Sequence, residues 1–161
     1  MFSSLIPVIY VQVSPERLTL KNIKSGESID EVPEVAISKT SKPVILAIGS
    51  QARMASASTT AKIVNPFAHP RSMVSDFTVA EHLLKHLVRC ILGKSLFTIA
   101  PCIIIHPLGD PVGGFTQVER RAFREMALSA GASKVHVWTG RPLTDEEVLF
   151  RRPPLEHGEW E

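Results

Sequence analysis

The stretch Gly113–Val137, GGFTQVERRAFREMALSAGASKVHV, contains the local signals that decide the fold predicted from the sequence. Thr116 and Glu119 have the spacing of a capping box, in which each side chain accepts a hydrogen bond from the other residue's backbone N–H. Apolar residues then recur at helical spacing, and Gly131 is placed to end the helix in a left-handed conformation. Lys134–Trp138 alternates as a strand does. The stretch therefore predicts a helix followed by a strand.

The same order of elements extends on both sides of this stretch. Phe77–Leu92 has an apolar stripe at helical spacing and a Thr78-x-x-Glu81 pattern that predicts a capping box. Cys102–His106 is apolar throughout, as a strand in a central parallel position is. Thr144 and Glu147 repeat the capping-box spacing, which predicts a last short helix. The second half of the chain thus alternates helix and strand.

The first third of the chain reads as β-structure. Ile6–Val13 and Arg17–Ile23 flank the turn signal Ser14-Pro15-Glu16, which predicts a hairpin. Two further short strands are expected at Glu34–Ser38 and Val44–Ile48. With the second half, this order predicts an α/β fold: a mixed five-stranded sheet with flanking helices.

Composition sets limits on domain count and partners. The 161 residues, 44% hydrophobic and 21% charged, fit one soluble domain, which we place at 1–150 with a loose C-terminal tail at 151–161. A net charge of +2 without a run of five like charges does not indicate nucleic-acid binding. There is no Cys-x-x-Cys, so no metal site of that kind is expected. No apolar run is long enough to span a membrane and the N-terminus is a poor secretory signal, so we expect a cytoplasmic protein.

Several short segments of the sequence, taken together and in order, resemble one family. They are Pro33–Ile37, Leu46–Gly49, Val74–Leu84, Val118–Ala122, Arg124-Glu125, Ala130–Ala132 and Lys134-Val135. They are similar to segments of the bacterial actin homologue MreB, the rod-shape-determining protein, over about Ile6 to Val137. The resemblance implies the ribonuclease-H-like fold of the first half of an actin-type ATPase.

The segment that would bind phosphate departs from this family. Actin-type ATPases carry an Asp-x-Gly-Thr loop between their first two strands, where the Asp helps to place magnesium and the backbone N–H groups approach phosphate. Here Val11 stands where the resemblance expects the Asp, Val13 stands at the glycine, and Pro15 has no N–H to donate. The family's Glu-Glu-Pro segment after Val137 is replaced by Trp138–Leu143, and no counterpart of the second domain follows. We therefore expect no bound nucleotide, cofactor or metal.

Glu119 has two competing interpretations. In MreB-like ATPases, the Glu of the Thr-x-Val-Glu-Arg motif helps to position the attacking water, and the resemblance carries that role to Glu119. Such a carboxylate acts only against a fixed, metal-bound γ-phosphate. The capping box with Thr116 accounts for Glu119 without any catalysis, so we expect it to be inactive and to hold the helix start.

Three other places have residue types that can form sites. His82 and His86 lie one helical turn apart and permit a shared metal, although an exposed helix face is the simpler interpretation. His106 ends a strand where ligands gather in α/β sheets, yet a hydrogen-bonded structural histidine is favoured. Pro111–Gly114 precedes a helix and permits an anion, while a turn explains it equally.

Two functions follow from the resemblance. The first is a non-catalytic MreB-like domain that acts as a binding or scaffold component linked to cell shape, with an MreB filament, a cell-shape protein or a second copy as partner. The alternative is an ATP-binding actin-like ATPase completed by a partner chain or dimer mate. Met1-Phe2 with Leu5-Ile6 offers at most a weak membrane contact.

Overall fold

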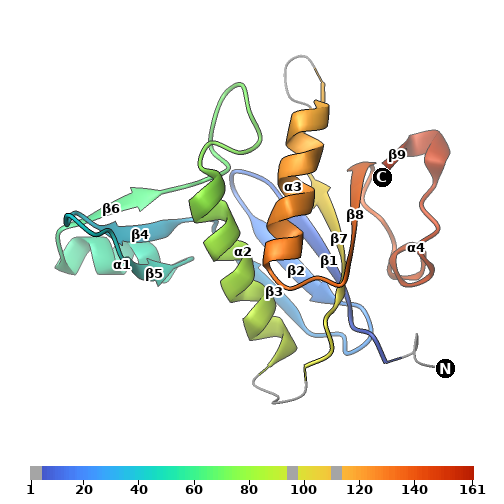
Figure 1. Cartoon of the computed structure of the whole chain (residues 1–161), viewed down its shortest axis with the longest axis horizontal. Coiled ribbons are helices and arrows are strands. Elements are labelled where there is room, and N and C mark those ends of the chain that lie inside the picture. Colours follow the sequence, from blue (N-terminus) through green and yellow to red (C-terminus); the bar gives the residue numbers. More distant parts are fainter. Residues whose placement is uncertain (1–4, 94–97, 110–113) are drawn as a thin grey trace.

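The computed structural model describes residues 5–93, 98–109 and 114–161, and all structural statements below concern these ranges. Figure 1 shows a larger sheet with two long helices in front of it and a smaller sheet at one end. The strands are β1 (Val8–Val13), β2 (Leu18–Asn22), β3 (Ser28–Glu31), β4 (Val35–Ser38), β5 (Ile45–Ile48), β6 (Ala61–Val64), β7 (Cys102–Pro107), β8 (Lys134–Gly140) and β9 (Gly158–Trp160). The α-helices are α1 (Gln51–Ser58), α2 (Phe77–Leu92), α3 (Gln117–Ser129) and α4 (Asp145–Phe150).

The larger sheet has the mixed topology expected of the predicted class. Its strand order is β3-β2-β1-β7-β8-β9, with β1, β7 and β8 parallel to one another and the outer strands antiparallel to their neighbours. It contains six strands instead of the five that we expected. The predicted strands 34–38 and 44–48 form β4 and β5, but they belong with β6 to a separate three-stranded sheet against which α1 packs.

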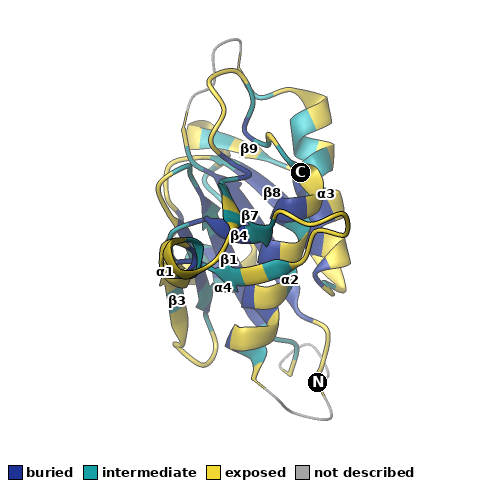
Figure 2. Cartoon of the chain, turned by 90° about the vertical axis from the view of Figure 1, so that its left-hand side faces the viewer, coloured by how far each residue is buried: buried dark blue, intermediate teal, exposed yellow. Residues whose placement is uncertain are grey.

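One face of the larger sheet carries the main core. Helices α2 and α3 cover this face (Figure 1), and their buried side chains meet those of alternate strand positions, including Ile9, Val11, Ile103 and Ile105. Figure 2 shows the buried residues concentrated between the helices and the sheet, whereas the outer helix surfaces are exposed. The helical periodicity of α2 placed its apolar stripe correctly, because packing on a sheet buries one side of a helix.

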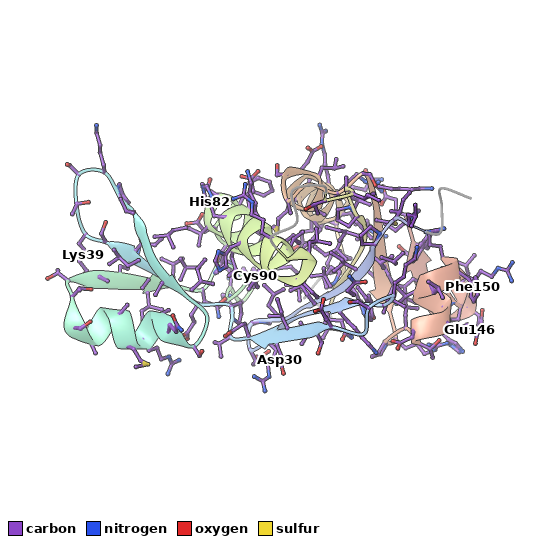
Figure 3. All side chains as sticks on the ribbon, turned by 90° about the horizontal axis from the view of Figure 1, so that it is seen from below. Asp30, Lys39, His82, Cys90, Glu146 and Phe150 are labelled. Atoms are coloured by element: carbon purple, nitrogen blue, oxygen red, sulfur yellow. The ribbon has the colours of Figure 1, made fainter. Side chains whose placement is uncertain are left out.

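The opposite face carries a smaller core. Val148 of α4 and Leu143 just before it pack on β1, β7 and β8, against Tyr10, Ile104 and Trp138. Strand alternation produces this division, since successive side chains of one strand point to opposite faces. Figure 3 places Glu146 and Phe150 of α4 at the end of the molecule away from Lys39, which belongs to the small-sheet region.

Two of the three predicted capping boxes are present. The Thr116/Glu119 box begins α3 and the Thr144/Glu147 box begins α4. The box predicted from Thr78 and Glu81 is wrong: α2 begins two residues earlier than that pattern implies, and Asp76 is its N-cap, accepting a hydrogen bond from Val79 N at 3.1 Å. The Asp76 side chain accepts a hydrogen bond from one of the free N–H groups of the first turn. The helix therefore begins before Thr78, and Thr78 already lies within it.

The expectation of a loose tail at 151–161 is also wrong. Residues 155–157 form a 3₁₀ turn and β9 pairs antiparallel with β8, joining Trp160 to Trp138 and Gly158 to Gly140. The sequence Gly-Glu-Trp-Glu carries no strand pattern of its own. It is extended because β8 offers it an unpaired edge.

Candidate functional site

The candidate site lies where parallel strands β1 and β7 end, beside the first turn of α3. Ligands of α/β proteins gather outside the carboxyl ends of parallel strands, so this edge is the place to test for nucleotide chemistry. Three elements meet there: the β1–β2 turn at residues 14–17, the end of β7, and the capped start of α3. Leu108 N donates to Val13 O at 2.7 Å, which fixes the end of β7 to the end of β1.

The β1–β2 turn is closed by its own hydrogen bonds. Ser14 N donates to Arg17 O at 2.9 Å, and Arg17 N donates to Ser14 Oγ at 3.0 Å. The carbonyl of Pro15 accepts from Asn65 Nδ2 at 2.7 Å, which ties the turn to the segment after β6. Two N–H groups of the turn are therefore used internally, and Pro15 has none. A phosphate cradle needs several free N–H groups that converge on one point.

The two valines of β1 are core residues. Val11 is fully buried and Val13 is 1% exposed, and both belong to the apolar cluster under α2 and α3. In the sheet, Val11 lies between Leu20 of β2 and Ile105 of β7. These are the positions that the resemblance assigns to the magnesium-placing Asp and to the glycine. Their side chains contribute to packing at the point where a nucleotide site would need a carboxylate and an open backbone.

Glu119 has both carboxylate oxygens engaged within the protein. Its Oε2 accepts from Thr116 N and from the Thr116 hydroxyl, each at 3.1 Å, and its own N–H donates to Thr116 Oγ1 at 3.2 Å. Its Oε1 accepts from Met73 N at 3.1 Å. The capping box that the sequence predicted is thus joined to the loop before α2, a contact that the local pattern could not show.

A hollow of about 450 Å³ opens at the same edge of the sheet. It is lined by residues from the end of β7, from α3, from β8 and from the C-terminal segment: Gly109, Phe115, Arg120, Thr139, Gly140, His157, Gly158 and Glu159. Arg120 is a cation at this place, and it forms an ion pair with Glu159. The charge that would attract an anion here is therefore already balanced by a carboxylate of the same chain.

His106 belongs to a buried chain of hydrogen bonds. Leu143 N donates to the Tyr10 hydroxyl at 3.1 Å, Tyr10 Oη lies 2.7 Å from His106 Nδ1, and His106 Nε2 lies 2.9 Å from Gly140 O. Since the Gly140 carbonyl can only accept, Nε2 carries the proton and Nδ1 accepts from Tyr10. His106 is 1% exposed, and the interpretation of a hydrogen-bonded structural histidine agrees with these contacts.

Burial shifts the pKa values of His106 and Tyr10 in opposite directions. It lowers the pKa of His106 to about 4 and raises the pKa of Tyr10 above its usual value, because a charge on either ring would lose its hydration. Both groups are therefore neutral at pH 7, and they link β1, β7 and the segment before α4. Sequence reasoning missed Tyr10, which looked like one more apolar strand residue.

The remaining candidate positions do not form a site in the described part of the chain. His82 and His86 are exposed on α2, where Figure 3 labels His82 and Cys90, and no group of three or more His, Cys, Asp or Glu is arranged to hold a metal. Residues 110–113 of the proposed anion loop and residues 1–4 of the proposed membrane contact lie outside the described ranges. Within those ranges, no helix is both long and apolar enough to cross a membrane.

Comparison with solved structures defines the class of protein. The fold is similar to that of MreB5 of Spiroplasma citri bound to AMPPNP, with a TM-score of 0.65 and 20% identity over 82% of this chain and 38% of the other. It is also similar to a chain of the MamK double helical filament, with a TM-score of 0.60 and 16% identity over 80% of this chain and 40% of that one. The chain therefore has the fold of an actin-like domain, as the sequence predicted.

Sequence comparison then identifies the family. The model of the MreB/Mbl protein family matches residues 20–142, and the chain belongs to that family. Relatives include the cell shape-determining protein MreB of Haemophilus influenzae, 29% identical over 71% of this chain, and Mbl of Bacillus subtilis, 31% identical over 70% of it. The matched part covers 32% of the length of each of these relatives. The family match begins after the β1–β2 turn and ends just before Leu143.

Proposed function

We propose that this chain is a non-catalytic MreB-like domain that works by binding, as a scaffold component linked to cell shape. The observation that carries the proposal is the β1–β2 turn, which is closed by Ser14 and Arg17 and is preceded by the buried Val11 and Val13. A nucleotide hydrolase of actin type needs a magnesium-placing carboxylate and free backbone N–H groups at this point.

The state of Glu119 supports the same proposal. Phosphoryl transfer depends on positioning and electrostatic stabilisation, so a water-positioning carboxylate must have an oxygen directed at the nucleophile. Both oxygens of Glu119 accept backbone hydrogen bonds, from Thr116 and from Met73. Three of the about four acceptor sites of this carboxylate are therefore used within the protein, and the bonds hold its two oxygens on Thr116 and Met73.

The family relationship supports a partner in the cell-shape machinery. The matched relatives carry the name cell shape-determining protein, and a structural neighbour is described as a filament. We therefore place this chain in the cytoplasm, in contact with an MreB filament, with another cell-shape protein or with a second copy of itself.

Calorimetry with magnesium-ATP tests the non-catalytic part of this proposal. At millimolar ligand we expect no saturable heat and no phosphate release above buffer. A full-length MreB from the same organism, measured in parallel, is the positive control. Micromolar affinity would overturn the proposal and favour the alternative of an ATPase completed by a partner chain or dimer mate.

Co-sedimentation tests the binding part. MreB filaments are assembled with nucleotide and centrifuged with this chain at physiological salt, and we expect the chain in the pellet in proportion to filament mass. A pellet without the chain, when filaments have formed, would contradict a filament partner. The two experiments are independent, because a domain can bind a filament without binding ATP.

A further inference from the structure

The last residues of the chain add a strand to the larger sheet at the edge of β8. Strand β9 pairs with the edge of β8, and Glu161 extends the pairing: its N–H donates to Val137 O at 3.0 Å and its carbonyl accepts from Val137 N at 2.9 Å. The family match ends at residue 142, so this segment is not part of what the chain shares with the family model. Figure 1 shows β9 at the side of the sheet, next to β8 and above α4.

The alternation of the segment separates its side chains by chemistry. On the side of α3, the carboxylate of Glu159 pairs with Arg120, and Glu161 Oε1 lies 3.7 Å from Arg124 Nη2. On the opposite side, the Trp160 ring stacks on His136 with 4.5 Å between centroids and 24° between planes. A strand presents alternate residues to opposite faces. The edge of β8 therefore contacts acidic residues at one set of positions and aromatic or small residues at the other.

The close fit at one position makes this contact specific. Gly158 lies opposite Gly140, and the indole of Trp138 packs against both. A Cβ added to Gly158 would overlap the Thr139 carbonyl oxygen and the Trp138 ring, and one added to Gly140 would overlap the His157 carbonyl oxygen and the same ring. Only glycine permits the two backbones to approach over the indole.

We propose that the edge of β8, bounded by Arg120 and Arg124 on one side and by His136 and Trp138 on the other, is a docking site for an extended acidic segment of a partner protein. The fitting segment has the order glycine, acid, tryptophan, acid. Residues 158–161 show this chemistry and occupy the site in cis, so they compete with the partner. Main-chain pairing supplies affinity at such an edge and the alternate side chains supply specificity.

The positive charge beside the edge of β8 indicates that the docking segment of the partner is acidic. Arg120 and Arg124 both project from α3 to the β8 edge, and each meets a carboxylate of the segment. Arg124 also donates to Val135 O at 3.3 Å, which keeps its guanidinium at the strand edge. A basic or uncharged strand would leave these partly buried guanidinium groups without a counter-charge.

The proposal is tested with full-length variants and a labelled peptide, Leu-Glu-His-Gly-Glu-Trp-Glu, that copies residues 155–161. The substitution Gly158→Val expels the cis segment because its side chain cannot fit over Trp138. We expect saturable peptide binding to this variant by fluorescence anisotropy. Binding to the unaltered chain should be at least about tenfold weaker, since a tethered competitor acts at millimolar effective concentration. Glu156→Val, a matched substitution at an exposed position of the same segment, should behave as the unaltered chain.

A charge exchange tests the same site without the glycine substitution. Arg120→Glu places two carboxylates together and should release the cis segment, after which the native peptide should not bind. A peptide with arginine in place of Glu159 should bind to that variant at least about tenfold more tightly than the native peptide does. The proposal is overturned if a folded Gly158→Val variant shows no saturable binding. It is also overturned if Arg120→Glu does not distinguish the two peptides.

Discussion

The carboxylate of Glu119 joins two segments that are 46 residues apart in sequence. Its Oε1 accepts a hydrogen bond from the backbone N–H of Met73 at 3.1 Å, while its Oε2 accepts from the backbone N–H of Thr116 at the same distance. The side chain that the family resemblance would assign to water positioning therefore holds the loop before α2 against the start of α3.

Removing this carboxylate should cost stability. In Glu119→Ala the start of α3 loses its reciprocal cap and Met73 N–H loses its acceptor, so we expect about 2–3 kcal/mol less free energy of unfolding. Urea denaturation followed by circular dichroism measures this. Thr116→Ala is the matched control, because it removes the side-chain cap alone and should cost about 1 kcal/mol. Equal losses in the two variants would contradict a role for the Met73 contact.

The hydroxyl of the buried Tyr10 is expected to be important for stability. Tyr10→Phe keeps the ring and removes the group that bonds both His106 Nδ1 and Leu143 N. Two buried polar atoms would then lack a partner, so we expect a loss of about 1–3 kcal/mol in thermal or urea unfolding. A loss below about 0.5 kcal/mol would show that the hydrogen-bond chain does not stabilise the fold.

The buried histidine should make stability depend on pH. His106 titrates at about 4 in the folded protein and near 6.5 when unfolded, so the unfolded chain binds more protons between these values. The stabilisation is complete above about pH 6.5 and is lost as the pH falls towards 4, by on the order of 3 kcal/mol in total.

Urea midpoints between pH 7.5 and 5 measure this dependence. His106→Gln should have a flatter profile than the unaltered chain, although His136 adds a dependence of the same sign because burial also lowers its pKa to about 4. A ring signal of His106 that titrates near pH 6.5 in nuclear magnetic resonance would refute the buried neutral imidazole.

Restoring the family carboxylate should not restore ATP chemistry. Val11→Asp places a carboxylate in the apolar cluster under α2 and α3, and we expect it to cost about 4 kcal/mol or more. Calorimetry with magnesium-ATP should still show no binding. Val11→Ala should be less destabilising, since it leaves no unpaired charge. A stable Val11→Asp protein that binds magnesium-ATP would contradict our account of this strand.

The start of α2 distinguishes the observed cap from the one that the pattern predicted. Asp76→Ala should lower the free energy of unfolding by about 1 kcal/mol, because the side chain accepts from Val79 N. Thr78→Ala, two residues later, should change it by no more than about 0.5 kcal/mol. The reverse order of the two effects, measured by the same denaturation, would restore the Thr78/Glu81 box.

Much of the fold was predictable because its signals are local. The predicted strands on either side of the Ser14–Glu16 turn, the helical stripe of α2 and the capping boxes at Thr116 and Thr144 all depend on residues within a few positions of one another. The polar edge strand β3 and the short β6 have no such pattern, and neither was predicted. Their extended conformation is decided by strands β2 and β4, with which they pair.

The candidate site also combines features that local sequence predicts with contacts that it does not predict. The resemblance to the family predicted that the phosphate-loop residues are missing, and the fixed spacing of Thr116 and Glu119 predicted the capping role of Glu119. The sequence could not identify the acceptor role of Glu119 towards Met73, the partner of Tyr10, or the docking of β9. Each of these contacts joins positions that only the tertiary structure brings together.

By itself, then, the amino-acid sequence determined the class of the fold and, through its resemblance to MreB, the family, since both depend on which residue types stand in order along the chain. The tertiary structure alone decided that Gly158–Trp160 forms a strand. Its conformation is fixed by the free edge of β8, by two arginines of α3 and by an indole that only a glycine can approach.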